Sequence, residues 1–178
     1  MKDLTQYLNE VRLSDLKRTV SAEHTYNYHP KDHKELKELV EELIRQRGLN
    51  ADLNDIDTSS VTDMSRLFQL SKFNGDISQW DVSNVENMRY MFYKSAFNGD
   101  ISGWDVSSVG KMEYMFTYSK FNGDISQWDV SSATDMAYMF FHSVFNGDIS
   151  GWDVSKVRYM DDMFSKCPLE KHPPKWFK

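Results

Sequence analysis

The sequence predicts an α/β solenoid made of short coils, each with one strand and one helix. Two observations predict it. A 24-residue segment, FNGDISQWDVSNVENMRYMFYKSA, begins at Phe73 and recurs without insertion at Phe97, Phe121 and Phe145. A more divergent copy, LNADLNDIDTSSVTDMSRLFQLSK, begins at Leu49. A fixed period of about 20 to 50 residues is typical of solenoids, whose coils bury their apolar residues against neighbouring coils.

Composition limits the classes of partner. The chain has 178 residues, of which 40% are hydrophobic, enough for the core of one short solenoid. The net charge of −6 argues against nucleic acid and anionic lipid, because phosphate binding needs a basic face. The single cysteine, Cys167, permits no internal disulfide. No run approaches the roughly 18 apolar residues of a membrane span, so no membrane insertion is expected.

Residues 1–48 form the expected N-terminal capping segment. The pattern is compatible with a helix over 1–20 and a short strand within 19–28. A clearer helix is predicted over about 32–47, where Asp32 and Glu35 provide a capping start and Gly48 provides the end. Its apolar positions form one stripe: Leu36, Leu39, Val40, Leu43 and Ile44. We expect this helix to cover the apolar end of the first coil.

Each repeat reads as turn, strand and helix, and five repeats span 49–168. Asn74 and Gly75 have turn chemistry. The strand is predicted at I-x-x-W-x-V, which is the spacing of a leucine-rich repeat, and the helix from a stripe at i, i+3, i+6 and i+7. The prediction is a right-handed leucine-rich-repeat-like solenoid. The inward positions of one coil are Phe73, Ile77, Trp80, Val82, Val85, Met88, Met91 and Phe92.

Methionine and tryptophan recur in columns along the array. A metal or peptide site and a packed core both fit the methionines, and the core is favoured because Met at helical spacing fills gaps. Each Trp indole needs an acceptor, for which a backbone carbonyl of the adjacent coil is the simplest candidate. After the last coil, residues 169–178 are expected to form a C-terminal cap with Trp176 and Phe177, in preference to an adhesive tail.

The repeat FNGDISQWDVSNVENMRYMF resembles that of BspA-like leucine-rich-repeat proteins, the bacterial surface protein 26-residue repeat, which is related to a mycoplasma lipoprotein repeat. The resemblance covers roughly residues 28–176. It implies a solenoid without catalytic chemistry or cofactor, and a binding module for protein or glycan that acts in adhesion or host interaction at the cell surface. The N-terminus, however, reads as no signal peptide. The alternative is therefore a cytoplasmic interaction or scaffold protein of bacterial origin.

Few residues suggest chemistry. No phosphate-loop, dinucleotide-binding or zinc motif is present. Cys167 and His172 are the only neighbouring Cys–His pair, so an enzyme is the weakest class. Asp76 and Asp81 each recur in every coil. Their carboxylates either accept backbone N–H groups in nearby turns or bind calcium, and the local bonds are favoured because calcium wants about 6–8 ligands.

Two surfaces compete as the site for a partner, and the molecule is expected to be a monomer. The predicted helix face carries a tyrosine column with varied neighbours, which fits the aromatic anchors of protein interfaces. Stacking between coils on a convex surface would also explain that column. The predicted strand face, concave by analogy, is polar and acidic. The candidate partner-binding residues are Tyr90, Tyr114, Tyr138, Gln79, Asp81, Asp105, Gln127 and Asp129.

Overall fold

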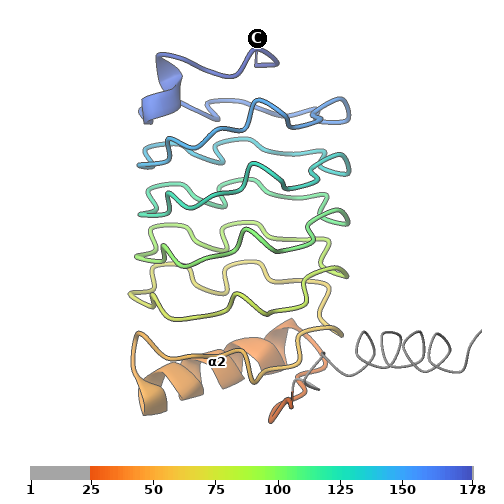
Figure 1. Cartoon of the computed structure of the whole chain (residues 1–178), viewed down its shortest axis with the longest axis vertical. Coiled ribbons are helices and arrows are strands. Elements are labelled where there is room, and N and C mark those ends of the chain that lie inside the picture. The colour runs from red at the N-terminus through yellow and green to blue at the C-terminus, as the bar shows by residue number, and fades with distance from the viewer. Residues whose placement is uncertain (1–24, 178) are drawn as a thin grey trace, which may run out of the picture.

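The computed structural model describes residues 25–177. It is a stack of flattened coils with helix α2 across the N-terminal end (Figure 1). The predicted repeat solenoid with one N-terminal helix is confirmed in this architecture. The expected helix over 1–20 lies outside the described residues. Of the strand expected within 19–28, Tyr28 forms a parallel bridge to Ile56 of the first coil.

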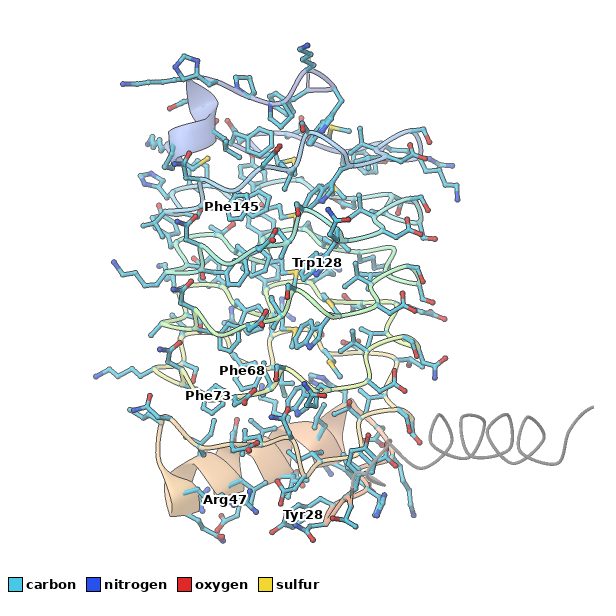
Figure 2. The ribbon with its side chains drawn as sticks, viewed as in Figure 1. Tyr28, Arg47, Phe68, Phe73, Trp128 and Phe145 are labelled. Carbon is cyan, nitrogen blue, oxygen red and sulfur yellow. The ribbon has the colours of Figure 1, made fainter. Side chains whose placement is uncertain are left out.

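Helix α2 spans His33–Arg47 and begins at its predicted cap. The Asp32 carboxylate accepts the backbone N–H of Glu35 at 2.9 Å, and the Gly48 N–H donates to Ile44 at the other end. Leu36, Val40 and Leu43 are buried against the first coil. The guanidinium of Arg47, labelled in Figure 2, donates to both carboxylate oxygens of Asp55, at 2.9 and 3.0 Å. The helix therefore closes one end of the core and is fixed there by a bidentate ion pair.

Each coil has two long sides with the core between them. We call residues 73–82 and their equivalents the Trp side, and residues 87–94 and their equivalents the Tyr side. All eight predicted inward positions of the coil that starts at Phe73 are 0–3% exposed. Phe92 of the Tyr side stacks on Phe97 of the Trp side at 4.6 Å between ring centroids. The methionine columns therefore belong to the core, as expected.

The helix predicted in each coil is absent from the described residues, which contain only α2 and the short 3-10 helix η1, Pro168–Glu170. The Tyr side is instead a run of tight turns. The N–H groups of Met91 and Ser95 donate to carbonyls three residues earlier, at 3.1 Å. Tyr90 and Lys94 have φ of 57° and 52°, in the left-handed region that no α-helix contains. Each turn joins residues three apart, such as Met88 and Met91, and this explains why the apolar spacing resembled a helix.

Coil spacing is the physical reason for this difference. Alternate N–H groups of the Tyr side donate to the next coil rather than along their own. The pairs, at 2.9–3.1 Å, are Met88 to Lys111, Tyr90 to Glu113, Phe92 to Met115 and Lys94 to Thr117. These bonds hold neighbouring chains about 5 Å apart, as in a parallel sheet. An α-helix with its side chains is about 10 Å wide and cannot stack at that repeat.

The Trp side is joined mainly by side chains. The predicted indole bond is present in all four coils that contain the tryptophan. For example, Trp80 Nε1 donates to the Leu53 carbonyl at 2.9 Å, and Trp128 Nε1 to Ile101 at 3.1 Å. Trp176 continues this column by donating to Ile149 at 2.9 Å, and Phe177 packs on Phe164. The C-terminal residues thus cover part of the last coil, as expected of a cap.

The two sides differ in coil spacing. Equivalent ring centroids repeat at 6.3–6.4 Å in the Phe73 column. The same repeat is 5.5–6.0 Å in the Phe92 column, from Phe68 to Phe164, and 4.5–4.8 Å in the Tyr90 column. A stack with a shorter repeat on one side curves toward it. The Tyr side is therefore the inner side. Of the interpretation that the tyrosines stack between coils on a convex surface, the stacking is present and the convex position is wrong.

Candidate binding surfaces

The tyrosine column forms a stacked ladder along the inner side. Tyr90 and Tyr114 are 4.5 Å apart between centroids, and Tyr114 and Tyr138 are 4.8 Å apart, with interplanar angles of 4° and 5°. All three have positive φ, so the same turn places each ring. Arg66 occupies the equivalent position of the first coil and lies 5.0 Å from the Tyr90 ring centroid. Neighbours thus cover both faces of Tyr90 and Tyr114 and one face of Tyr138, and all three tyrosines are half-buried.

Charge differs between the two ends of this ladder. Arg66 stands at one end and Asp162 occupies the equivalent position at the other. The negative charge of Asp162 raises the pKa of Tyr138. Burial, followed by the adjacent tyrosines, raises the pKa of Tyr114. Both shifts favour the protonated phenol of Tyr114 and Tyr138, and each hydroxyl has a neighbour in the ladder, Tyr90 for Tyr114 and Asp162 for Tyr138.

Glu113 is an unexpected buried acid beside the ladder. Its side chain is 7% exposed and pairs with the Arg89 guanidinium of the preceding coil. Its Oε2 has no hydrogen-bond partner among residues 25–177. Burial raises the pKa of this carboxyl, outweighing the opposing effect of Arg89. In the sequence, Arg89, Glu113 and Ala137 read as varied surface neighbours of the tyrosines, whereas in the structure Arg89 and Glu113 form an ion pair.

The second candidate surface lies on the opposite long side. Its predicted residues Gln79, Asp81, Asp105, Gln127 and Asp129 are all exposed. Each carboxylate accepts the backbone N–H two residues later. The bonds are Asp81 to Ser83 at 3.0 Å, Asp105 to Ser107 at 3.0 Å and Asp129 to Ser131 at 2.9 Å. The core separates these residues from the tyrosines, so the two candidate surfaces are not brought together.

Local hydrogen bonds account for the repeated aspartates. The Ser107 hydrogen bonds hold the pKa of Asp105 below its usual range, and the Ser131 N–H does the same for Asp129. In the other acidic column, Asp76 accepts the Ser78 N–H at 2.9 Å, which lowers its pKa. Within residues 25–177, no group of three or more His, Cys, Asp or Glu side chains could hold a metal ion. The turn geometry therefore explains both columns without a cation.

Cys167 is placed unfavourably for a nucleophile. Its side chain is buried, and burial raises the pKa of the thiol. A catalytic cysteine needs the opposite shift, since the thiolate is the reactive form. His172, its neighbour in the sequence, is exposed.

The repeats match a known protein family. The model of the family described as "Mycoplasma protein of unknown function, DUF285" matches twice, over residues 34–120 and 96–176. The chain belongs to this family. Together the two matches of the DUF285 family model cover α2, the coils and most of the C-terminal segment. No curated protein and no solved structure matches the chain. No helix among the described residues is long and apolar enough to cross a membrane.

Sequence reasoning missed one group of residues on the surface of this DUF285 chain. It noted that Tyr93, Tyr118, Phe141 and His142 crowd one loop, but not the lysines that share it. Lys94 Nζ lies 5.3 Å from the Tyr93 ring centroid and 5.1 Å from that of Tyr118. A count of charges at each position of the repeat would have revealed them.

Proposed function

We propose that this chain is a non-enzymatic binding module that recognises a protein partner through the inner, Tyr side of its stack. The observation that supports this most is the tyrosine ladder, a continuous row of stacked, half-buried rings across three coils. Tyrosine is enriched at protein interfaces because it combines apolar area with a polar group. The covered ring faces favour a protein over a glycan, since a sugar would need an open face for stacking.

The resemblance of the repeat to BspA-like leucine-rich-repeat proteins supports adhesion or host interaction as the biological role, and a right-handed stack. The rival role is an interaction or scaffold protein inside a bacterial cell. Both roles use the same surface, so the surface is tested first. The polar Trp side is the competing site, with Gln79 and Gln127 at its exposed edge.

The test compares variants of the full chain as immobilised bait for proteins from host-cell and bacterial extracts. One variant changes Tyr90, Tyr114 and Tyr138 to Ser, and another changes Gln79 and Gln127 to Lys. Changing the three tyrosines to Phe is the matched control, because it keeps the stacked rings and removes only the hydroxyl groups. Circular dichroism and melting curves verify that each variant is folded.

We expect the Tyr→Ser variant to lose the proteins that the parent retains, and the Gln→Lys variant to keep them. The Tyr→Phe control then tells whether hydroxyl groups or ring edges carry the affinity. If the Lys variant loses the partner and the folded Ser variant keeps it, the assignment to the Tyr side is wrong. Retention of the same proteins by all variants would exclude both surfaces.

A further inference from the structure

One corner of the stack differs in charge from the rest of this acidic molecule. We define the basic ridge as the turns in which each coil passes from its Tyr side to the following Trp side, residues 69–72, 93–96, 117–120, 141–144 and 165–168. None of these turns contains Asp or Glu, although the chain has 27 acidic residues. Each contains one basic residue. In order, these are Lys72, Lys94, Lys120, His142 and Lys166.

Aromatic rings position several of these basic side chains. Lys94 Nζ lies between the rings of Tyr93 and Tyr118, 5.3 and 5.1 Å from their centroids. His142 stacks on Tyr118 at 4.6 Å, and Lys166 Nζ lies 5.8 Å from the Phe141 centroid. Cation–π contacts of this kind restrain an ammonium group while leaving its hydrogen-bond donors free.

The lysines of the basic ridge have no acidic partners among residues 25–177. All four are exposed, and the ion pairs of the described chain involve other residues. The repeated aspartates lie outside these turns, on the Trp side, as with Asp76 and Asp81. The basic ridge is therefore a strip of unpaired positive charge on an acidic molecule.

The spacing of the basic groups along the stack is close to the side-chain spacing of an extended peptide. Phenylalanine columns on either side of the basic ridge repeat at 5.6 and 6.4 Å per coil, so successive coils follow at about 6 Å, each with one basic group. The basic group is the second residue of the turn in three coils and the fourth in two. An extended peptide places alternate side chains on one face about 6.6–6.8 Å apart. Because Lys94 lies over the Tyr118 ring and His142 stacks on it, this ring of the basic ridge is already occupied and is a poor platform for a sugar or a nucleobase.

We propose that the basic ridge binds an extended acidic peptide segment of a protein partner, with Asp or Glu at alternate positions, one carboxylate per coil. This inference rests on the proposed function, because it gives the chemistry of the partner. It concerns a surface adjoining the tyrosine ladder, which Tyr93 and Phe141 contact at 5.6 and 5.7 Å between ring centroids. One partner could therefore occupy both.

The experiment measures fluorescence anisotropy of a labelled peptide of about ten residues with alternating Glu and Ser, long enough to span the coils. Its Gln–Ser counterpart tests the need for charge. The ridge variant changes Lys72, Lys94, Lys120 and Lys166 to Gln. The matched control changes four exposed lysines elsewhere to Gln, so that the net charge is equal. These are Lys111, Lys156, Lys171 and Lys175.

We expect the parent and the control to bind the Glu–Ser peptide, and the ridge variant to bind it at least tenfold more weakly. Binding should weaken as salt rises from about 50 to 200 mM, since exposed charges are screened. Equal binding by the ridge variant and the control, or no preference over the Gln–Ser peptide, overturns the proposal. So does tighter binding of a sulfated dextran or a single-stranded oligonucleotide tested in parallel. Such failures would leave the tyrosine ladder untouched, because the Tyr→Ser variant tests it separately.

Discussion

Gly75 is the position at which one added methyl group should disturb the stack most. A Cβ at Gly75 would lie 2.0 Å from the carbonyl oxygen of Ala51 and 2.8 Å from its backbone nitrogen. Backbone atoms cannot rotate away as the end of a side chain can, so the coils must separate by more than about 1 Å. The fixed spacing of close-packed coils makes such an insertion costly.

The expected loss of unfolding free energy follows from the hydrogen bonds at this contact. A separation of more than about 1 Å would break three backbone bonds that now measure 2.8–3.0 Å. They run from Asn74 to Leu49, from Asp76 to Ala51 and from Leu53 to Asp76. At about 1 kcal/mol for each lost bond, Gly75→Ala should cost roughly 2–4 kcal/mol. That corresponds to a fall in melting temperature of roughly 4–16 °C for a chain of this size.

Gly103 provides the matched control. Nothing lies within 4 Å of a Cβ built there. Gly103→Ala should leave stability unchanged or raise it by roughly 0.4–1 kcal/mol, by restricting the unfolded chain. Gly99, whose added Cβ would lie 2.9 Å from the Phe97 ring and 3.1 Å from the Gly75 carbonyl, should fall between the two. Thermal melts followed by circular dichroism measure the series. If Gly75→Ala and Gly103→Ala melt within a degree of each other, this account of coil spacing is refuted.

Four further outcomes are expected. Trp128→Phe should lower the unfolding free energy by roughly 1–3 kcal/mol, because it removes the indole N–H that donates to the buried Ile101 carbonyl at 3.1 Å. A denaturant titration measures this loss, and an unchanged midpoint would contradict a stabilising role for the indole bonds. Relative to the parent, Glu113→Gln should gain stability as pH rises from about 4 to 7. Burial raises the pKa of the Glu113 carboxyl in the folded state. The protonated carboxyl therefore stabilises the folded parent fully below the unfolded pKa of 4.5, and this contribution is lost as pH rises through the folded pKa. A melting-temperature difference that does not change over this range would contradict the burial of Glu113. Deleting residues 97–120 should leave a shorter protein that unfolds cooperatively, whereas deleting half of that segment should abolish the transition, since only whole coils keep the columns in register. A chelator should leave the melting temperature unchanged, because backbone N–H groups already occupy the Asp76 and Asp105 carboxylates; a rise of several degrees with millimolar calcium would indicate a bound cation.

The sequence by itself determined the period, the core and the helix that closes the N-terminal end. Identical spacing of Phe73, Phe97 and Phe121 can be satisfied only if equivalent residues stack, because one coil is too small to bury its own apolar side chains. The capping signal at Asp32 and the apolar stripe after it are local, so helix α2 was predictable from sequence alone. The indole bonds followed for a similar reason, since a buried indole N–H needs an acceptor.

Only the tertiary structure decided the conformation of the Tyr side and the direction of curvature. Apolar residues three apart, such as Met88 and Met91, fit a helix and a run of three-residue turns equally well. The choice between them depends on the distance to the next coil, which no local pattern contains. Hydrogen bonds such as Phe92 to Met115 fix that distance near 5 Å and exclude a helix. They also bring the tyrosines to the inner side and bury Glu113 against Arg89, although each of these residues reads as exposed in the sequence.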